Sequence, residues 1–272
     1  MNLSLFLHSL KSSRGGVITW SFFLCLYALL MVYMFESMKG MADILVEYLD
    51  KFGTMVEVFA GEMGSIVNPD GSLSLGKWLS LEYLALWPVM MSVYAIFYAG
   101  GIAAKEVERG TMDMLLSQPV PRRHIIISKF LTFPVAIVTV AAISIAGVLI
   151  GMAIIDNYSD LGGILLAFFP ALLIPLAVAS YSLLFSCIFL EPRKVMIAAG
   201  SLTGLFYLLN ILARAVEPLK WLGNLSIFHY YTPGAITSDL SMNWLGIGIY
   251  LGISIVTFTA SLYVFQRRDI VV

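Results

Sequence analysis

Long, uninterrupted apolar runs dominate this chain of 272 residues, and short polar stretches separate them. Each run is close to the roughly 20 residues that a helix needs to cross the hydrocarbon core of a bilayer. The runs are continuous rather than alternating over about ten residues, which excludes a transmembrane barrel. The pattern predicts an all-α polytopic membrane protein with six transmembrane helices, at residues 16–35, 83–104, 130–154, 163–190, 195–213 and 244–265.

Two stretches are amphipathic instead of continuously apolar, and neither is predicted to cross the membrane. Residues 1–15 carry apolar side chains at helical spacing, namely Leu3, Phe6, Leu7 and Leu10. This pattern predicts an N-terminal helix that lies in the membrane interface. A second apolar stripe, from Met41 to Phe52, falls within the 36–82 region, and acidic residues occupy its other face. We expect 36–82 to be an extracellular amphipathic region.

The composition narrows the function classes. Apolar residues make up 60% of the chain and charged residues 12%, against about 25% charged in an average globular protein, which excludes a soluble globular domain and a disordered chain. Two cysteines in apolar runs and three scattered histidines give neither a disulfide framework nor a metal-ligand spacing. The sequence contains no phosphate-binding loop and no visible nucleophile elbow. We therefore predict no catalytic site in this chain.

The charges also predict the orientation and the source of energy. With the N-terminus in the cytoplasm, 11 of the 16 Lys and Arg residues fall on the inner side, as the positive-inside rule requires. Both termini are then cytoplasmic, in the plasma or inner membrane. No Asp, Glu, Lys or Arg lies in the middle of a predicted span. Ion-coupled transporters usually need such groups, so any transport here is expected to be powered from elsewhere.

The segment between the second and third spans, Lys105–Lys129, carries the richest local signal. Gly110 breaks the helical pattern, and Thr111 is a suitable N-cap for a short second helix. Met112, Leu115 and Leu116 fall on one face of that helix, and Pro119 and Pro121 end it. A helix of about two turns is not stable alone in water. It must bury its apolar face on a partner or in lipid, and both possibilities remain open on these residues alone.

This segment resembles the signature of ABC-2 type permeases, the membrane subunits of ABC transporters. The matching positions are Glu106, Glu108, Gly110, Thr111, Leu115, Leu116, Pro119, Val120, Arg122 and Lys129. The end of the chain, from Phe265 to Asp269, and the stretch Leu225–Pro233 also resemble the family. The resemblance covers nearly the whole chain and identifies 1–272 as a single ABC-2 type transmembrane domain.

The resemblance implies a mechanism and a set of partners. Residues 111–118 would form a cytoplasmic coupling helix that docks into a separately encoded ATP-binding cassette subunit, which would bind the ATP and Mg. The implied coupling interface comprises Glu106, Glu108, Arg109, Gly110, Thr111, Met112, Leu115, Leu116, Pro119 and Arg122. The other expected partners are a second copy of the permease, in a homodimer, and membrane lipid. Nucleic acid is not an expected partner. The expected function is that of an exporter subunit that carries no cofactor of its own.

Three alternatives remain open at this level. The chain could be a stand-alone membrane-embedded enzyme or anchor protein without an ATPase partner. Glu106 and Glu108 could be plain solvated charges. The glycine pairs Gly147/Gly151, Gly200/Gly204 and Gly248/Gly252 permit close helix approach, either within one chain or between two copies.

Overall fold

The computed structural model describes residues 3–39, 73–112 and 121–268. All regular elements in these ranges are helices, and most of them are long. They are α1 (Leu3–Ser12), α2 (Arg14–Lys39), α4 (Leu75–Leu79), the π-helix η2 (Ser80–Leu84), α5 (Trp87–Ala99), α6 (Gly101–Glu108), α8 (Arg122–Phe130), α9 (Thr132–Ile154), α10 (Leu161–Phe189), α11 (Pro192–Ala215), the 3-10 helix η3 (Glu217–Leu225), α12 (Pro233–Asp239) and α13 (Trp244–Arg267).

Six helical stretches are long and apolar enough to cross a membrane, which confirms the predicted all-α, six-span fold. They are Arg14–Met38, Leu75–Glu108, Arg123–Ile154, Leu161–Phe189, Pro192–Ala215 and Trp244–Arg267. Apart from its ends, a helix satisfies its backbone N–H and C=O groups within its own segment, so it suits a chain that must cross hydrocarbon. The predicted stripe from Met41 to Phe52 lies outside the described residues.

The second stretch begins at Leu75 rather than near residue 83. Lys77 and Glu82 interrupt the apolar run, so hydropathy alone places the start too late. The helix starts there because its first turn is capped and packed: the Ser74 hydroxyl accepts a hydrogen bond from the Lys77 N–H, and Leu75 is fully buried. Glu82 therefore lies inside this helix, in the π-helical turn η2.

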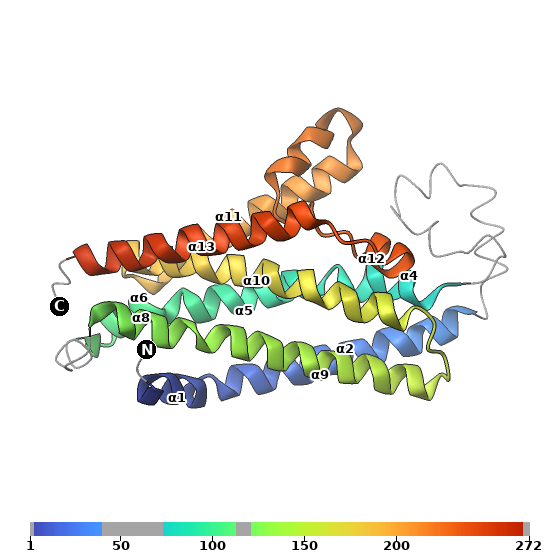
Figure 1. Cartoon of the computed structure of the whole chain (residues 1–272), viewed down its shortest axis with the longest axis horizontal. Helices are drawn as coiled ribbons and strands as arrows, with labels where there is room; N and C mark the ends of the chain where they lie inside the picture. The colour runs from blue at the N-terminus through green and yellow to red at the C-terminus, as the bar shows by residue number, and fades with distance from the viewer. Residues whose placement is uncertain (1–2, 40–72, 113–120, 269–272) are drawn as a thin grey trace.

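The helix α10 lies at the centre of the bundle and contacts α5, α13, α11 and α12. The helices α2 and α9 form a second pair beside it, visible along the lower edge of Figure 1. Glycines set the spacing of this pair, because an added Cβ at Gly147 would meet Cys25 Sγ at 2.9 Å and one at Gly151 would meet Val32 Cβ at 2.9 Å. The first of the three glycine pairs therefore packs within the chain.

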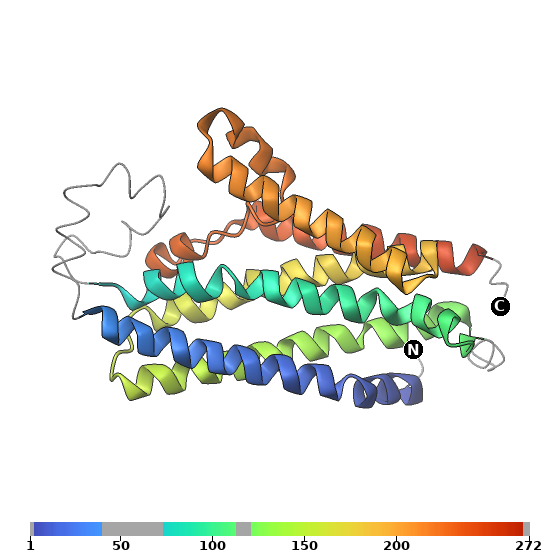
Figure 2. The same ribbon diagram turned by 180° about the vertical axis from the view of Figure 1, so that it is seen from behind.

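The hairpin of α11 and η3 leans away from the other helices, as Figures 1 and 2 both show. Its return is attached to α11 through Ser226, whose hydroxyl donates to the Phe206 carbonyl oxygen at 2.6 Å. Further along, the Tyr231 hydroxyl donates to the Ala167 carbonyl oxygen of α10 at 3.3 Å. Burial raises the pKa of Tyr231 well above its usual range, so this side chain remains a neutral donor.

The bundle has two distinct ends. The helices α1, α6, α8 and the last turns of α13 lie at one end, which we call the α6/α8 end; α8 contacts the other three. The opposite end, the α4/α12 end, contains α4, η2, α12 and the start of α10. The N-terminal helix α1 and the C-terminal turns of α13 thus lie at the same end of the bundle, as an even number of membrane crossings requires. Leu3 and Leu7 of α1 are more than half exposed there, so α1 presents an apolar face outward.

Candidate functional site

The predicted break at Gly110 is a Schellman motif that ends α6. The Thr111 N–H donates to the Glu106 carbonyl oxygen at 3.0 Å, and the Gly110 N–H donates to the Val107 carbonyl oxygen at 3.0 Å. Gly110 has a φ of +65°, a conformation that glycine adopts without strain. This glycine therefore turns the chain sharply out of the second span at a fixed point.

The Glu106 carboxylate joins three parts of the segment. Lys129 Nζ in α8 lies 2.6 Å from Glu106 Oε1, and the Thr111 hydroxyl donates to Glu106 Oε2 at 2.5 Å. The side chains of Lys129 and Glu106 are only 15% and 25% exposed. Such charge-assisted hydrogen bonds are stronger than those between neutral groups. We call these three residues the stem cluster, because they close the base of the segment between α6 and α8.

Neighbouring contacts fix the position of the stem cluster. The Tyr98 hydroxyl of α5 donates to the Lys129 carbonyl oxygen at 3.0 Å. The backbone N–H groups of Ala103 and Ala104 both donate to the Ser186 hydroxyl of α10, at 3.1 and 3.0 Å. The start of α6 is thus held against the central helix, and α8 is held against α5. The stem cluster belongs to the packed bundle and not to a loose loop.

Thr111 belongs to the stem cluster, and the predicted interface residues other than Thr111 and Met112 divide into three groups. Glu108, Arg109 and Gly110 are exposed at the end of α6. Glu106 is ion-paired and partly buried, so the interpretation of a plain solvated charge is wrong for it. The prediction for Leu115, Leu116 and Pro119 falls outside the described residues, and of Arg122 only the backbone, at the start of α8, is described.

Met112 departs from the expected role. Its side chain is 1% exposed and packs into the hydrophobic core of the chain itself. It is therefore not available to a partner in this structure, although its spacing places it on one face with Leu115 and Leu116. A periodic pattern identifies a buried face, but it does not say whether the covering surface belongs to the same chain.

Sequence reasoning missed the most informative residues. The sequence motif ends at Lys129 but does not predict its partner, because 23 residues separate Lys129 from Glu106 and no spacing rule connects two such positions. Tyr98 belongs to an aromatic run in the second span, but that pattern does not predict its contact with Lys129. Ser186 carries no signal, since it lies within an apolar span. Among the described residues, no three His, Cys, Asp or Glu side chains come together as metal ligands could.

The α4/α12 end has a carboxylate cluster of its own. The Asp160 Oδ2 atom accepts hydrogen bonds from the Ser74 hydroxyl at 2.9 Å and from the Gly76 N–H at 3.1 Å. Asp160 precedes α10 with a φ of +61°. A polar cavity of about 500 Å³ lies beside it, and its lining includes Lys77 and Thr237. We call Asp160, Ser74 and Gly76 the outer clasp.

Comparison with known proteins gives one result for the chain as a whole. A family model described as ABC-2 family transporter protein matches residues 6–270. No curated protein matches the sequence. The matched range includes the stem cluster, the outer clasp and all six apolar helices.

Proposed function

This chain belongs to the ABC-2 family of transporter proteins, and from that premise we propose that it is the membrane subunit of an ATP-driven exporter. A separate ATP-binding cassette subunit hydrolyses the ATP and binds the Mg. The chain converts the movement of that subunit into a rearrangement of its six helices. It is a multi-pass protein of the plasma or inner membrane.

The stem cluster is the observation that carries this proposal. Its three side chains connect the end of the second span, the residue after the turn and the last turn of α8, which belongs to the third span. When the cassette subunit displaces residues 111–121, the stem cluster transmits this displacement to the second and third spans together. A flexible connection would not transmit it. Tyr98 and Ser186 extend the connection to α5 and α10.

The proposed docking surface is small and combines apolar with charged side chains. Leu115 and Leu116 supply the apolar contact, whereas the exposed Glu108 and Arg109 supply charge at its rim. Protein interfaces of this kind combine a hydrophobic centre with a polar border. Met112 anchors the segment to its own bundle, so the partner contacts the two leucines and not the methionine.

The chain has no site for ATP in this account. Gly71, Gly76 and Lys77 have the spacing of a phosphate-binding loop, but Trp78 follows where that motif needs Ser or Thr. The Trp78 indole N–H donates to the Met31 carbonyl oxygen of α2 at 2.9 Å. The local structure is the capped start of a membrane helix, so ATP and Mg belong to the cassette subunit.

We place the α6/α8 end in the cytoplasm, where the cassette subunit is found. The charge bias of the sequence supports this orientation. A membrane-impermeant maleimide tests it with Glu108→Cys and Ser159→Cys, two exposed positions at opposite ends. In intact cells Ser159→Cys becomes labelled and Glu108→Cys does not; the reverse result contradicts the orientation.

Two copies of the chain form the complete transporter in this proposal. Added Cβ atoms at Gly200 and Gly204 of α11 meet nothing within 4 Å, in contrast to the packed Gly147 and Gly151. Their face of α11 is open to a second copy, and α11 is turned to the viewer with α2 and α5 in Figure 2. The exposed Ser201 lies on this stretch.

Cysteine cross-linking tests the dimer. Ser201→Cys is suitable because its side chain is exposed, whereas Thr203 is buried and its hydroxyl donates to the Ala199 carbonyl oxygen at 2.7 Å. Oxidation in native membranes produces a covalent dimer of the Ser201→Cys variant and none of the unmodified chain. If no dimer forms, α11 packs against lipid instead.

Purification in mild detergent from the cells that encode the chain tests the main proposal. The expected eluate hydrolyses ATP, and mass spectrometry identifies a protein with a phosphate-binding loop in it. An eluate that contains only this chain and shows no ATP turnover favours the other candidate, a stand-alone membrane enzyme or anchor protein.

A further inference from the structure

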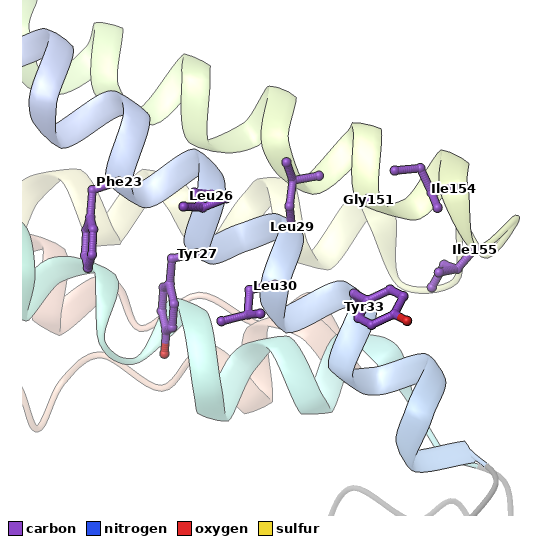
Figure 3. Close-up of a pocket in the computed structure, with 9 residues that line it drawn as sticks. All are labelled: Phe23, Leu26, Tyr27, Leu29, Leu30, Tyr33, Gly151, Ile154 and Ile155. Carbon is purple, nitrogen blue, oxygen red and sulfur yellow. The ribbon is translucent and has the colours of Figure 1, made fainter.

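A groove of about 500 Å³ runs between α2 and α9 on the outside of the bundle. Six of its lining residues lie on α2 between Phe23 and Tyr33, and three lie at or just after the end of α9, between Gly151 and Ile155, as Figure 3 shows. Known ligand pockets have volumes of about 300–1,000 Å³. The groove is therefore large enough to hold part of a molecule, and it belongs to neither the stem cluster nor the outer clasp.

The lining of the groove is almost entirely apolar. The rings of Phe23 and Tyr27 stack with centroids 6.5 Å apart and line one part of it. The Tyr27 hydroxyl donates to the Glu82 carbonyl oxygen at 2.7 Å, so its polar atom is already occupied. Water needs two or more polar partners to remain in a cavity. The groove does not provide them along its length, so an apolar occupant fits it better than water.

The length of the groove matches one leaflet of a bilayer. From Phe23 to Tyr33 a helix rises about 15 Å, at about 1.5 Å per residue. The hydrocarbon core of a bilayer is about 30 Å thick, so one leaflet contributes about half of it. Both helices belong to membrane-spanning stretches. The groove thus lies at the depth of the lipid acyl chains, and its length matches that of one acyl chain.

One end of the groove has the chemistry of a headgroup region. The helix α9 ends at Ile154, and the polar residues Asp156 and Asn157 follow. Tyr33 lines this end and is 67% exposed, and Tyr158, two residues after Asp156 in the sequence, is 53% exposed. Exposed tyrosines are enriched at the depth of lipid headgroups. An amphipathic molecule can therefore place its polar group here and its apolar tail toward Phe23.

We propose that the α2–α9 groove binds one acyl chain of a membrane phospholipid from the leaflet at the α4/α12 end. The phospholipid headgroup lies beside Tyr33 and Asp156, and the chain extends along α2 to Phe23. A second copy of the chain is the competing occupant, because side chains of one helix can pack into a groove on another. The site is independent of the cassette subunit and of ATP.

Photo-crosslinking tests this proposal with the full chain in vesicles. The probe is a phosphatidylcholine with a diazirine on one acyl chain, mixed into phosphatidylcholine vesicles, and mass spectrometry maps the adducts. We expect adducts at residues 23–33 and 151–155 to exceed those at other exposed positions of α2 and α9 several-fold. Equal adducts over the whole exposed surface of these helices overturn the proposal.

Two matched variants separate a specific site from general lipid contact. Leu30→Trp fills the groove from α2 and lowers the adducts at 151–155 several-fold. Val138→Trp is the control, because Val138 on α9 is 55% exposed and lies outside the lining, and it leaves those adducts unchanged. Both positions are at least half exposed, so neither change disturbs the core. If Leu30→Trp has no effect on the adducts at 151–155, the groove does not bind an acyl chain.

A cysteine at the same position tests for the competing occupant, a second copy. Leu30→Cys is oxidised in vesicles and compared with the unmodified chain, which has only Cys25 and Cys187. We expect no additional covalent dimer, since a phospholipid chain covers this position. A disulfide-linked dimer that needs Leu30→Cys overturns the proposal and assigns the groove to the contact between two copies.

Discussion

The helix Leu75–Glu108 is attached to a different span at each of its ends, and a carboxylate makes the attachment both times. At the α6/α8 end, Glu106 forms an ion pair with Lys129, which lies in the first part of the third span. At the α4/α12 end, Asp160 accepts hydrogen bonds from Ser74 and Gly76, at the start of the same helix. The stem cluster thus contains a charged pair, whereas the outer clasp joins a carboxylate to neutral donors.

The difference shows how one helix can serve two purposes. A helix N-terminus supplies free N–H groups, so the outer clasp needs only one charged group to hold α4 in place. A helix C-terminus offers no free donors, so the stem cluster needs Lys129 and Thr111 to satisfy Glu106. The α6/α8 end therefore has a fixed base where the chain leaves the second span, and at the α4/α12 end the start of the same helix packs against α10 and α12. Four pairs of variants test this comparison.

The largest effect is expected from Gly163→Ala at the α4/α12 end. An added Cβ at Gly163 would lie 2.5 Å from the Thr237 Cα atom of α12, and backbone cannot move aside as a side chain can. We expect a loss of about 3 kcal/mol in the free energy of unfolding, measured in mixed micelles. Gly162→Ala is the control, because its Cβ meets nothing within 4 Å. Equal losses for both variants would show that this end is not closely packed.

Lys129→Ala tests the charged pair of the stem cluster. The change leaves the partly buried Glu106 carboxylate without its cation, so we expect the free energy of unfolding to fall by about 2 kcal/mol. The matched control is Lys194→Ala, whose pair with Glu191 at 2.7 Å is about 60% exposed and is worth about 0.5 kcal/mol. A smaller loss for Lys129→Ala than for the control contradicts the role of the stem cluster.

Gly110→Ala tests the turn above the stem cluster. Space is not the obstacle, since an added Cβ meets nothing within 4 Å, but the φ of +65° is unfavourable for alanine. We expect a loss of about 1 kcal/mol in the free energy of unfolding. Gly110→Asn should recover most of the loss, because asparagine tolerates this conformation. If alanine and asparagine behave alike, the positive φ is not required.

The smallest effect is expected from Asp160→Asn. Together with Glu106→Gln, it compares the contributions of the Asp160 and Glu106 carboxylates directly. Asparagine keeps an oxygen that can accept from Ser74 and Gly76, and it tolerates the φ of +61°. We expect a loss of about 0.5 kcal/mol. Glu106→Gln, measured in the same way, should cost more because it removes an ion pair. The reverse order would place the stronger attachment at the α4/α12 end.

The fold was largely predictable from the sequence, because apolar runs of membrane length have few alternatives to a helix. The start at Leu75 was not predictable, since Lys77 and Glu82 lower the hydropathy and the Ser74 cap is a tertiary detail. Of the candidate site, Gly110 was predicted together with its turn, and the structure supplies the hydrogen bonds. The pairing of Glu106 with Lys129 depends on how two spans lie side by side, which no local pattern encodes.

The burial of Met112 also shows what a local sequence pattern cannot predict. Its helical spacing correctly indicated a covered face, but the covering surface is the core of the same chain. The glycine pairs show it again, because identical spacing gives a packed pair at Gly147 and an open one at Gly200. Patterns of this kind identify faces, and only the three-dimensional arrangement identifies what lies against them.

The central claim is that residues 111–118 transmit the work of a cassette subunit, and ATP turnover of the purified complex tests it most directly. Leu115→Asp and Leu116→Asp are expected to abolish ATP turnover in the eluate while the chain still inserts into the membrane. The control is Leu240→Asp, an exposed leucine in the turn after α12 at the opposite end whose φ of +52° suits aspartate, and it should retain full turnover. Undiminished ATP turnover with Leu115→Asp and Leu116→Asp would contradict the claim.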